Sequence, residues 1–220
     1  MESDSSIILL SIRVGVISTF ITSIFGFIFA WILVKKNFRG KFFLDLLISL
    51  PIALPPVLVG YFLLWLFGRS NFFGELLYSS FGINLTYTWF AAVAASFLVS
   101  LPLVTRSFMI AISGVDKNIE IVAKSLGLNT FQTIRYIIIP LAKNGIFAGI
   151  VLGFIRSLSE FGATIVVAGN IPGKTQTIPL GIYTKISNSS ESEIWPLIII
   201  SVIISTFTLS IYYYLLRQTD

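Results

Sequence analysis

Residues Glu120–Pro140 read EIVAKSLGLNTFQTIRYIIIP, and this stretch decides how the chain is organised. It carries acidic, basic and amide side chains, whereas the stretches before and after it are long and apolar. Charged side chains are costly inside a bilayer, so this stretch is a poor candidate for a membrane span. We expect it to lie in water between two membrane-spanning helices, and we call residues 116–139 the polar segment.

The composition of the whole chain predicts a multi-span membrane protein. Of 220 residues, 55% are hydrophobic and 11% are charged, whereas soluble domains carry about 25% charged residues. The chain has no cysteine and no histidine, which excludes thiol nucleophiles, disulfides and imidazole acid–base chemistry. We therefore expect a single transmembrane domain over residues 1–220, with no catalytic residues, no metal site and no bound cofactor. The acidic N-terminus differs from a secretory leader, so no leader is expected.

Five apolar runs are long enough to cross about 30 Å of hydrocarbon, which predicts an all-α protein with five spans. The runs cover residues 7–34, 42–67, 87–112, 141–168 and 194–216. The second run contains Pro51, Pro55 and Pro56, which remove backbone donors and predict a kink or a break. Two interpretations of that break remain open: an irregularity that lines a pathway, or a packed kink.

Basic residues flank these runs unevenly, and this asymmetry predicts the orientation. The richer side carries Lys35, Lys36, Arg39, Lys41, Arg106, Lys117, Lys124, Arg135, Lys143 and Arg217. On the other side, Arg69, Lys174 and Lys185 are balanced by Glu75, Glu191 and Glu193. By the positive-inside rule, the N-terminus lies outside, whereas the C-terminus and the polar segment are cytoplasmic. The same rule accounts for the net charge of +5 without a nucleic-acid partner.

The polar segment is expected to form two short helices. Asp116 is a candidate N-cap, Gly127 fits a helix stop, and Glu120 and Lys124 have the spacing of a helical ion pair. The apolar residues Ile119, Val122, Ala123 and Leu126 share one helical face. Asn129 and Gln132 resemble the cap of a second helix, which is expected to stop at Pro140. From the residues alone, a surface connector and a docking site for a soluble partner are equally good interpretations.

Glu120, Ala123 and Gly127, followed by Ile137-x-Ile139-Pro140, resemble the EAA signature of binding-protein-dependent ABC importer permeases. Val122 and Ile139 depart from the usual alanine and leucine, and both positions stay apolar. The resemblance implies the type I ABC importer permease fold and a cytoplasmic coupling helix that docks on an ATPase subunit. In this family Glu120 and Gly127 would shape the helix, and Ala123 would keep the docking surface flat. The implied ATPase-coupling residues are Glu120, Ala123, Leu126, Gly127 and Pro140.

Residues 159–180, SEFGATIVVAGNIPGKTQTIPL, closely resemble the molybdate/tungstate importer permeases. Sulfate permeases share the Glu-Phe-Gly core, so sulfate or thiosulfate is the alternative cargo. The resemblance implies a translocation pathway or gate at Arg156, Glu160, Phe161, Gly162, Ala163 and Thr164. It also implies an external loop whose candidate residues are Gly169, Asn170, Pro172, Gly173, Thr175 and Thr177.

Arg156 and Glu160 are spaced i, i+4 inside the fourth apolar run, where charges usually face a cavity or each other. Two interpretations are open. The residues form a structural ion pair, or Arg156 offsets the charge of a dianion while Glu160 limits its affinity. For residues 169–179 a surface loop and a contact with the pathway or a partner are both open.

The resemblance also implies the assembly. It consists of two copies of the permease as a homodimer, two ABC ATPase subunits and one extracytoplasmic oxyanion-binding protein in the cell membrane. The sequence lacks a phosphate-binding loop of the Gly-x-x-x-x-Gly-Lys-Ser/Thr type, so ATP and Mg²⁺ would be used by the partner ATPase. A channel or secondary transporter is the competing class, although no internal repeat supports it.

Overall fold

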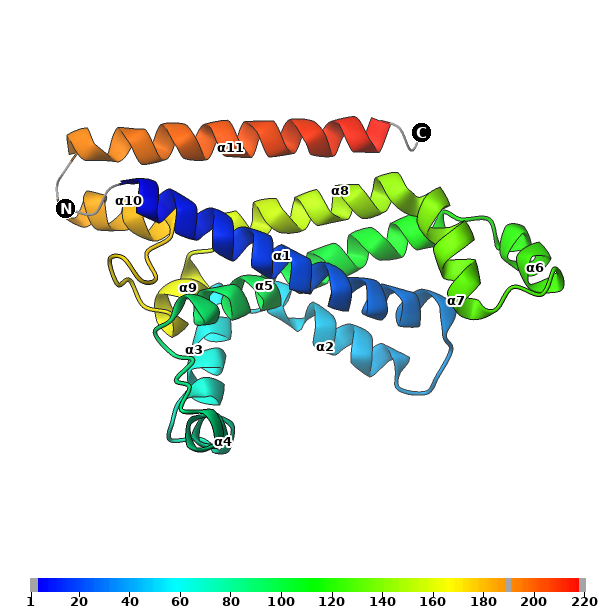
Figure 1. Cartoon of the computed structure of the whole chain (residues 1–220), viewed down its shortest axis with the longest axis horizontal. Helices are drawn as coiled ribbons and strands as arrows, with labels where there is room; N and C mark the ends of the chain where they lie inside the picture. Colours follow the sequence, from blue (N-terminus) through cyan, green and yellow to red (C-terminus); the bar gives the residue numbers. More distant parts are fainter. Residues whose placement is uncertain (1–3, 189–190, 218–220) are drawn as a thin grey trace.

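The computed structural model describes residues 4–188 and 191–217, and the described residues are helical without a strand (Figure 1). The helices are α1 (Asp4–Lys35), α2 (Lys41–Ala53), α3 (Pro56–Phe67), α4 (Phe72–Phe81), α5 (Trp89–Ser113), α6 (Lys117–Ser125), α7 (Thr130–Thr133), the π-helix η1 (Ile134–Ile138), α8 (Ile139–Leu158), α9 (Gly162–Val167), α10 (Ile178–Ser187) and α11 (Glu191–Arg217). The predicted all-α fold is confirmed.

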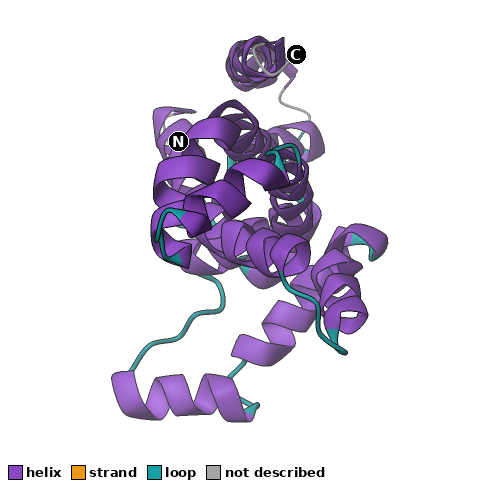
Figure 2. Cartoon of the chain, turned by 90° about the vertical axis from the view of Figure 1, so that its right-hand side faces the viewer, coloured by secondary structure: helices purple, strands orange, loops and turns teal. Residues whose placement is uncertain are grey.

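Helices α1, α5 and α8 form the centre of the bundle, and small or hydroxyl residues let them approach closely. The hydroxyl groups of Thr22 in α1 and Ser100 in α5 lie 3.2 Å apart. A Cβ at Gly26 would lie 3.2 Å from Val104 of α5. Helix α11 runs along one side of this bundle, and most of the surface of α11 itself is uncovered (Figure 2). Apolar side chains on that surface suit lipid or a second protein chain.

Four helical stretches among the described residues are long and apolar enough to span a membrane, or five if a bent pair counts as one. Helices α1, α5 and α11 match the first, third and fifth predicted spans. The second predicted span is broken, because α2 and α3 meet at 113°. The break falls at Leu54, which has the extended backbone that a following proline favours, and Pro55 and Pro56 then start α3. Pro51 stays inside α2.

The prediction for residues 141–168 was wrong at both ends. A continuous helical stretch runs from Thr130 to Leu158, and the chain breaks at residues 159–161 before α9 begins. The expected stop at Pro140 was also wrong. The π-helix η1 precedes it, and the Ile139 N–H donates to the Ile134 carbonyl. The wider π turn accommodates a proline ring that would clash in a regular helix, so the polar segment continues directly into a membrane helix.

Helices α3 and α9 cross so closely that Gly60 is required. A Cβ at Gly60 would lie 2.5 Å from the Ala163 carbonyl oxygen, which is backbone and cannot rotate away. Alanine has better helix propensity than glycine by about 1 kcal/mol, but the overpacking is expected to cost about 1–3 kcal/mol. We therefore expect Gly60→Ala to lower the thermal unfolding midpoint in detergent. Gly40→Ala is the control, since its Cβ would lie 3.6 Å from the nearest atom; equal midpoints for the two variants would contradict the close crossing.

Candidate functional site

The first helix of the polar segment, α6, has the ends that the sequence predicts. Asp116 accepts a hydrogen bond from the Asn118 N–H at 2.8 Å. At the other end, the Gly127 N–H donates to the Lys124 carbonyl and the Leu128 N–H to the Ala123 carbonyl. This pair of bonds is a Schellman motif, and Gly127 has the positive φ of +88° that the motif requires. Local hydrogen bonds therefore define α6 at both ends.

The second helix of the polar segment starts with a capping box. The Asn129 side chain accepts from the Gln132 N–H, and the Gln132 side chain accepts from the Asn129 N–H, both at 2.9 Å. This reciprocal pair satisfies two donors that helix starts leave free. The helix that begins here continues through η1 into α8, so the cap connects α6 to the bundle.

The apolar residues of α6 divide between an inner and an outer face. Ala123 is 4% exposed, whereas Leu126 is 76% exposed. Ile119, Ile121 and Val122 are also exposed. The buried position of Ala123 changes its expected role: it lets α6 pack closely on its own chain and does not flatten the outer surface. The outer surface of α6 thus exposes several large apolar side chains, which is typical of a protein-binding site.

Glu120 forms an ion pair with Lys35, a partner that the sequence did not suggest. Its carboxylate accepts from the Lys35 ammonium group at the end of α1. The expected pair with Lys124 is therefore replaced by a contact between two elements that are far apart in the sequence. Lys35 was missed because a sequence pattern shows helical spacings and not contacts across 85 residues.

In the membrane helices, the Arg156–Glu160 pair is present at the break between α8 and α9. Arg156 Nη2 lies 2.7 Å from Glu160 Oε2, and Glu160 Oε1 accepts from the Ala163 N–H at 2.8 Å. The Glu160 side chain is 1% exposed and the Arg156 side chain 29%. Glu160 thus holds the start of α9 and neutralises Arg156, and of the two side chains only that of Arg156 remains partly accessible.

Two interrupted pairs of helices, α2–α3 and α8–α9, meet at this point. The start of α3 lies against α9, where a Cβ at Gly162 would be 3.1 Å from Pro56. Ala163 and Thr164 are buried in the same contact, and the Phe161 ring lies 5.4 Å from that of Tyr183 in α10. All six predicted pathway residues therefore surround one junction of interrupted helices. Irregular backbone at membrane depth is typical of transporter binding sites.

The predicted external loop is exposed at its tip and buried toward its C-terminal end. Thr175 and Thr177 are 0% and 5% exposed, whereas Pro172 and Gly173 are exposed at the tip. Asn170 donates to Thr184 at 2.7 Å, and Gly169 and Gly173 supply turns of positive φ. Of the two open interpretations, the surface loop does not hold for residues 175–177, because all three are buried and the Gln176 side chain donates to Thr184 of α10. Only the tip is free to meet a partner.

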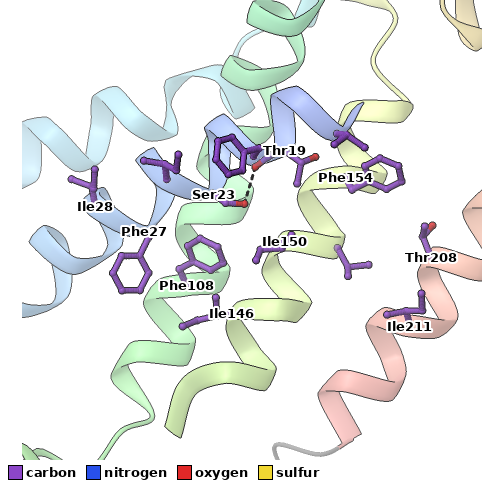
Figure 3. Close-up of a pocket in the computed structure, with 14 residues that line it drawn as sticks. Thr19, Ser23, Phe27, Ile28, Phe108, Ile146, Ile150, Phe154, Thr208 and Ile211 are labelled. Atoms are coloured by element: carbon purple, nitrogen blue, oxygen red, sulfur yellow. Dashed lines mark hydrogen bonds between the residues drawn. The ribbon is translucent and has the colours of Figure 1, made fainter. Parts of the chain in front are cut away.

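A separate pocket of about 760 Å³ lies between α1, α5, α8 and α11. Figure 3 shows that Phe27, Phe108 and Ile150 point into this space, together with Thr208 and Ile211 from α11. It offers almost no hydrogen-bond donors, because the Ser23 and Thr208 hydroxyls already donate to backbone carbonyls and the Thr19 hydroxyl is buried. An oxyanion would lose its hydration there without compensation, so the pocket is unsuited to such a cargo.

The contacts of two further residues were not predicted from the sequence. Arg106 was counted among the basic residues in or near the cytoplasmic loop; it lies inside α5, and its guanidinium is 2.8 Å from Asp45 of α2. It also donates to Ser49 at 2.9 Å. Gly60 was not considered, since its close contact with Ala163 depends on tertiary packing. The sequence did contain a signal for the Asp45–Arg106 contact, because Asp45 is an acidic residue in one apolar run and Arg106 is a basic residue in another.

The chain resembles known transport proteins over almost its whole length. Residues 22–220 match the family described as binding-protein-dependent transport system inner membrane component. The molybdenum transport system permease protein ModB of Escherichia coli (strain K12) is 44% identical over 211 residues, which cover 96% of this chain and 92% of that protein. The sulfate transport system permease protein CysT of the same strain is 37% identical over 178 residues, covering 79% and 64%.

A solved structure of the MetNI methionine ABC transporter in an inward-facing conformation has the same fold. It superposes with a TM-score of 0.68 over 100% of both chains at 13% identity. The family match, the relatives and the helical architecture agree, so this chain belongs to the family of inner-membrane components of binding-protein-dependent transport systems.

Proposed function

We propose that this chain is the membrane-spanning permease subunit of an ATP-driven importer for molybdate, with tungstate as a close analogue. The cargo rests on the similarity to ModB, which covers nearly the full length of both proteins. CysT is less similar and is covered over a shorter part, so sulfate is the second candidate. In the proposed orientation, the N-terminus faces outward and the C-terminus faces the cytoplasm.

The observation that carries the mode of action is the uncovered apolar surface of α6. An ABC ATPase subunit docks there in the proposed assembly, which contains two permease copies, two ATPase subunits and one oxyanion-binding protein. ATP binding closes the ATPase dimer and draws the two polar segments together. The transporter then alternates between inward-facing and outward-facing states by rigid-body movement.

The continuous helical stretch Thr130–Leu158 supports this mechanism. Its 29 residues extend about 43 Å at 1.5 Å per residue. One end begins at the capping box of the polar segment, and the other ends beside the Arg156–Glu160 pair. A displacement of α6 would therefore reach the junction of the broken helices through a single stiff element.

At that junction Arg156 would meet the oxyanion, because its side chain is accessible while Glu160 is covered. The fixed carboxylate keeps the net local charge near zero, so the dianion is attracted weakly enough to leave. Transport requires this balance, since a site that binds too tightly retains its cargo. A homodimer would place two such arginines on one pathway.

Uptake by the reconstituted complex tests the cargo. The chain is placed in liposomes with its ATPase and binding protein, and uptake of radiolabelled molybdate is measured with ATP. We expect excess tungstate to suppress uptake strongly and equal sulfate to leave most of it. Suppression by sulfate with little effect of tungstate would instead assign the chain to the sulfate permeases.

A further inference from the structure

The ion pair between Lys35 and Glu120 joins the polar segment to the end of α1. The Lys35 side chain is 16% exposed and that of Glu120 is 12% exposed, so both are largely shielded from water. The Lys35 ammonium group also lies 6.0 Å from the centre of the Trp31 ring. These contacts restrict Lys35 on two sides, unlike a freely mobile surface lysine.

The pair borders a polar cavity of about 180 Å³ between α1 and the polar segment. Its walls are formed by Trp31, Lys35, Lys36, Glu120, Lys124, Thr130 and Thr133. Glu120 is the acidic residue among three lysines there, so its carboxylate lowers the repulsion between them. Loss of that charge would separate the lysines and, with them, the two elements.

The rest of α6 is weakly attached to the bundle. It packs on α7 and η1, and its outer surface is exposed. By contrast, α1 packs extensively along α5 and also contacts α8. The Lys35–Glu120 pair is therefore placed to connect this weakly packed element with a helix that packs along the centre of the bundle.

We propose that Lys35 is a positioning residue, whose ion pair with Glu120 sets the orientation of α6 and transmits its displacement to α1. The role of the pair in transport rests on the proposed docking function, whereas its role in orienting α6 does not. Force from the ATPase would then enter the membrane by two routes, through α8 and through α1.

Distance measurements on the permease alone test the orienting role. The chain contains no cysteine, so spin labels are attached at Ser125→Cys on α6 and Lys143→Cys on α8, both at exposed positions. We expect a narrow distance distribution, which Lys35→Glu broadens because two carboxylates then repel. The exchange Lys35→Glu with Glu120→Lys should restore it. A distribution that Lys35→Glu leaves unchanged would overturn the proposal, whether or not an ATPase binds.

The transport role is measured on the complex with its ATPase. We expect Lys35→Glu to lower oxyanion uptake per ATP hydrolysed by at least about fivefold, and the charge exchange to recover most of it. ATPase co-purification should change little with Lys35→Glu, because Lys35 lies at the end of α1 and its side chain is largely shielded by the polar segment. If the exchange fails to recover uptake and the ATPase is lost with Glu120→Lys, Glu120 contacts the ATPase directly and the proposal is wrong. If the unsubstituted chain binds no ATPase, the docking function fails separately from the orienting role.

Discussion

Replacing Gly127 with valine is expected to weaken ATPase binding about five- to thirtyfold while the membrane helices stay folded. Gly127 has φ of +88°, and a left-handed backbone costs a residue with a Cβ about 1–2 kcal/mol, which corresponds to that range. A Cβ at Gly127 would meet no atom within 4 Å. The effect must therefore come from backbone conformation and not from a clash. Co-purification of the ATPase and substrate-stimulated ATP hydrolysis measure it.

Gly127→Asn is the matched control for this change. Asparagine adds a side chain of similar size but tolerates the left-handed region far better than a β-branched residue does. We expect the asparagine variant to keep most of the ATPase binding. If valine and asparagine behave alike, or if valine has no effect, the Schellman turn is not required for docking and the role of α6 must be reconsidered.

Replacing Glu160 with glutamine is expected to reduce transport at least about tenfold at a normal level of folded protein. Glutamine retains an oxygen that can accept from the Ala163 N–H, which Glu160 now does at 2.8 Å, so the start of α9 is preserved. The negative charge is lost, and Arg156 then holds an oxyanion without the counter-charge that permits release. Uptake into liposomes and the yield of monodisperse protein are measured together.

The double variant Arg156→Gln with Glu160→Gln separates a pathway from a structural pair. Under both interpretations the double variant should fold, because no unpaired charge remains. If the pair only holds the helices together, the double variant should also transport. If Arg156 meets the cargo, transport stays lost. Recovery of uptake would contradict the assignment of Arg156 to the pathway.

The sequence predicts those features that local chemistry determines. The caps at Asp116 and Asn129 and the turn at Gly127 depend on residues within a few positions of one another. The long apolar runs also predict α1, α5 and α11. A segment that crosses lipid must pair its own backbone N–H and C=O groups, and a helix does so within the segment. The all-α fold followed from these features, whereas the family was implied by the resemblance of residues 120–140 and 159–180 to known permeases.

Features that depend on tertiary contacts were not predictable in the same way. The continuation of the helix through Pro140 relies on a π turn, and the stop after Leu158 relies on the Glu160 carboxylate turning toward Ala163. The contacts Lys35–Glu120 and Gly60–Ala163 join residues from different helices. The hydrophobic periodicity of a single helix does not indicate which residues of two different helices will be in contact. The residues of the candidate site were therefore named from the sequence and their role stays a prediction, whereas their geometry required the structure.

The most direct test of the central claim is the energy source of molybdate uptake. Purified chain is reconstituted alone or with its ATPase and binding protein, and uptake is measured with ATP or with an imposed ion gradient. The account predicts uptake only by the full complex with ATP, because the chain offers a docking surface and a pathway but is driven through α6. Molybdate flux by the chain alone under an ion gradient would contradict it.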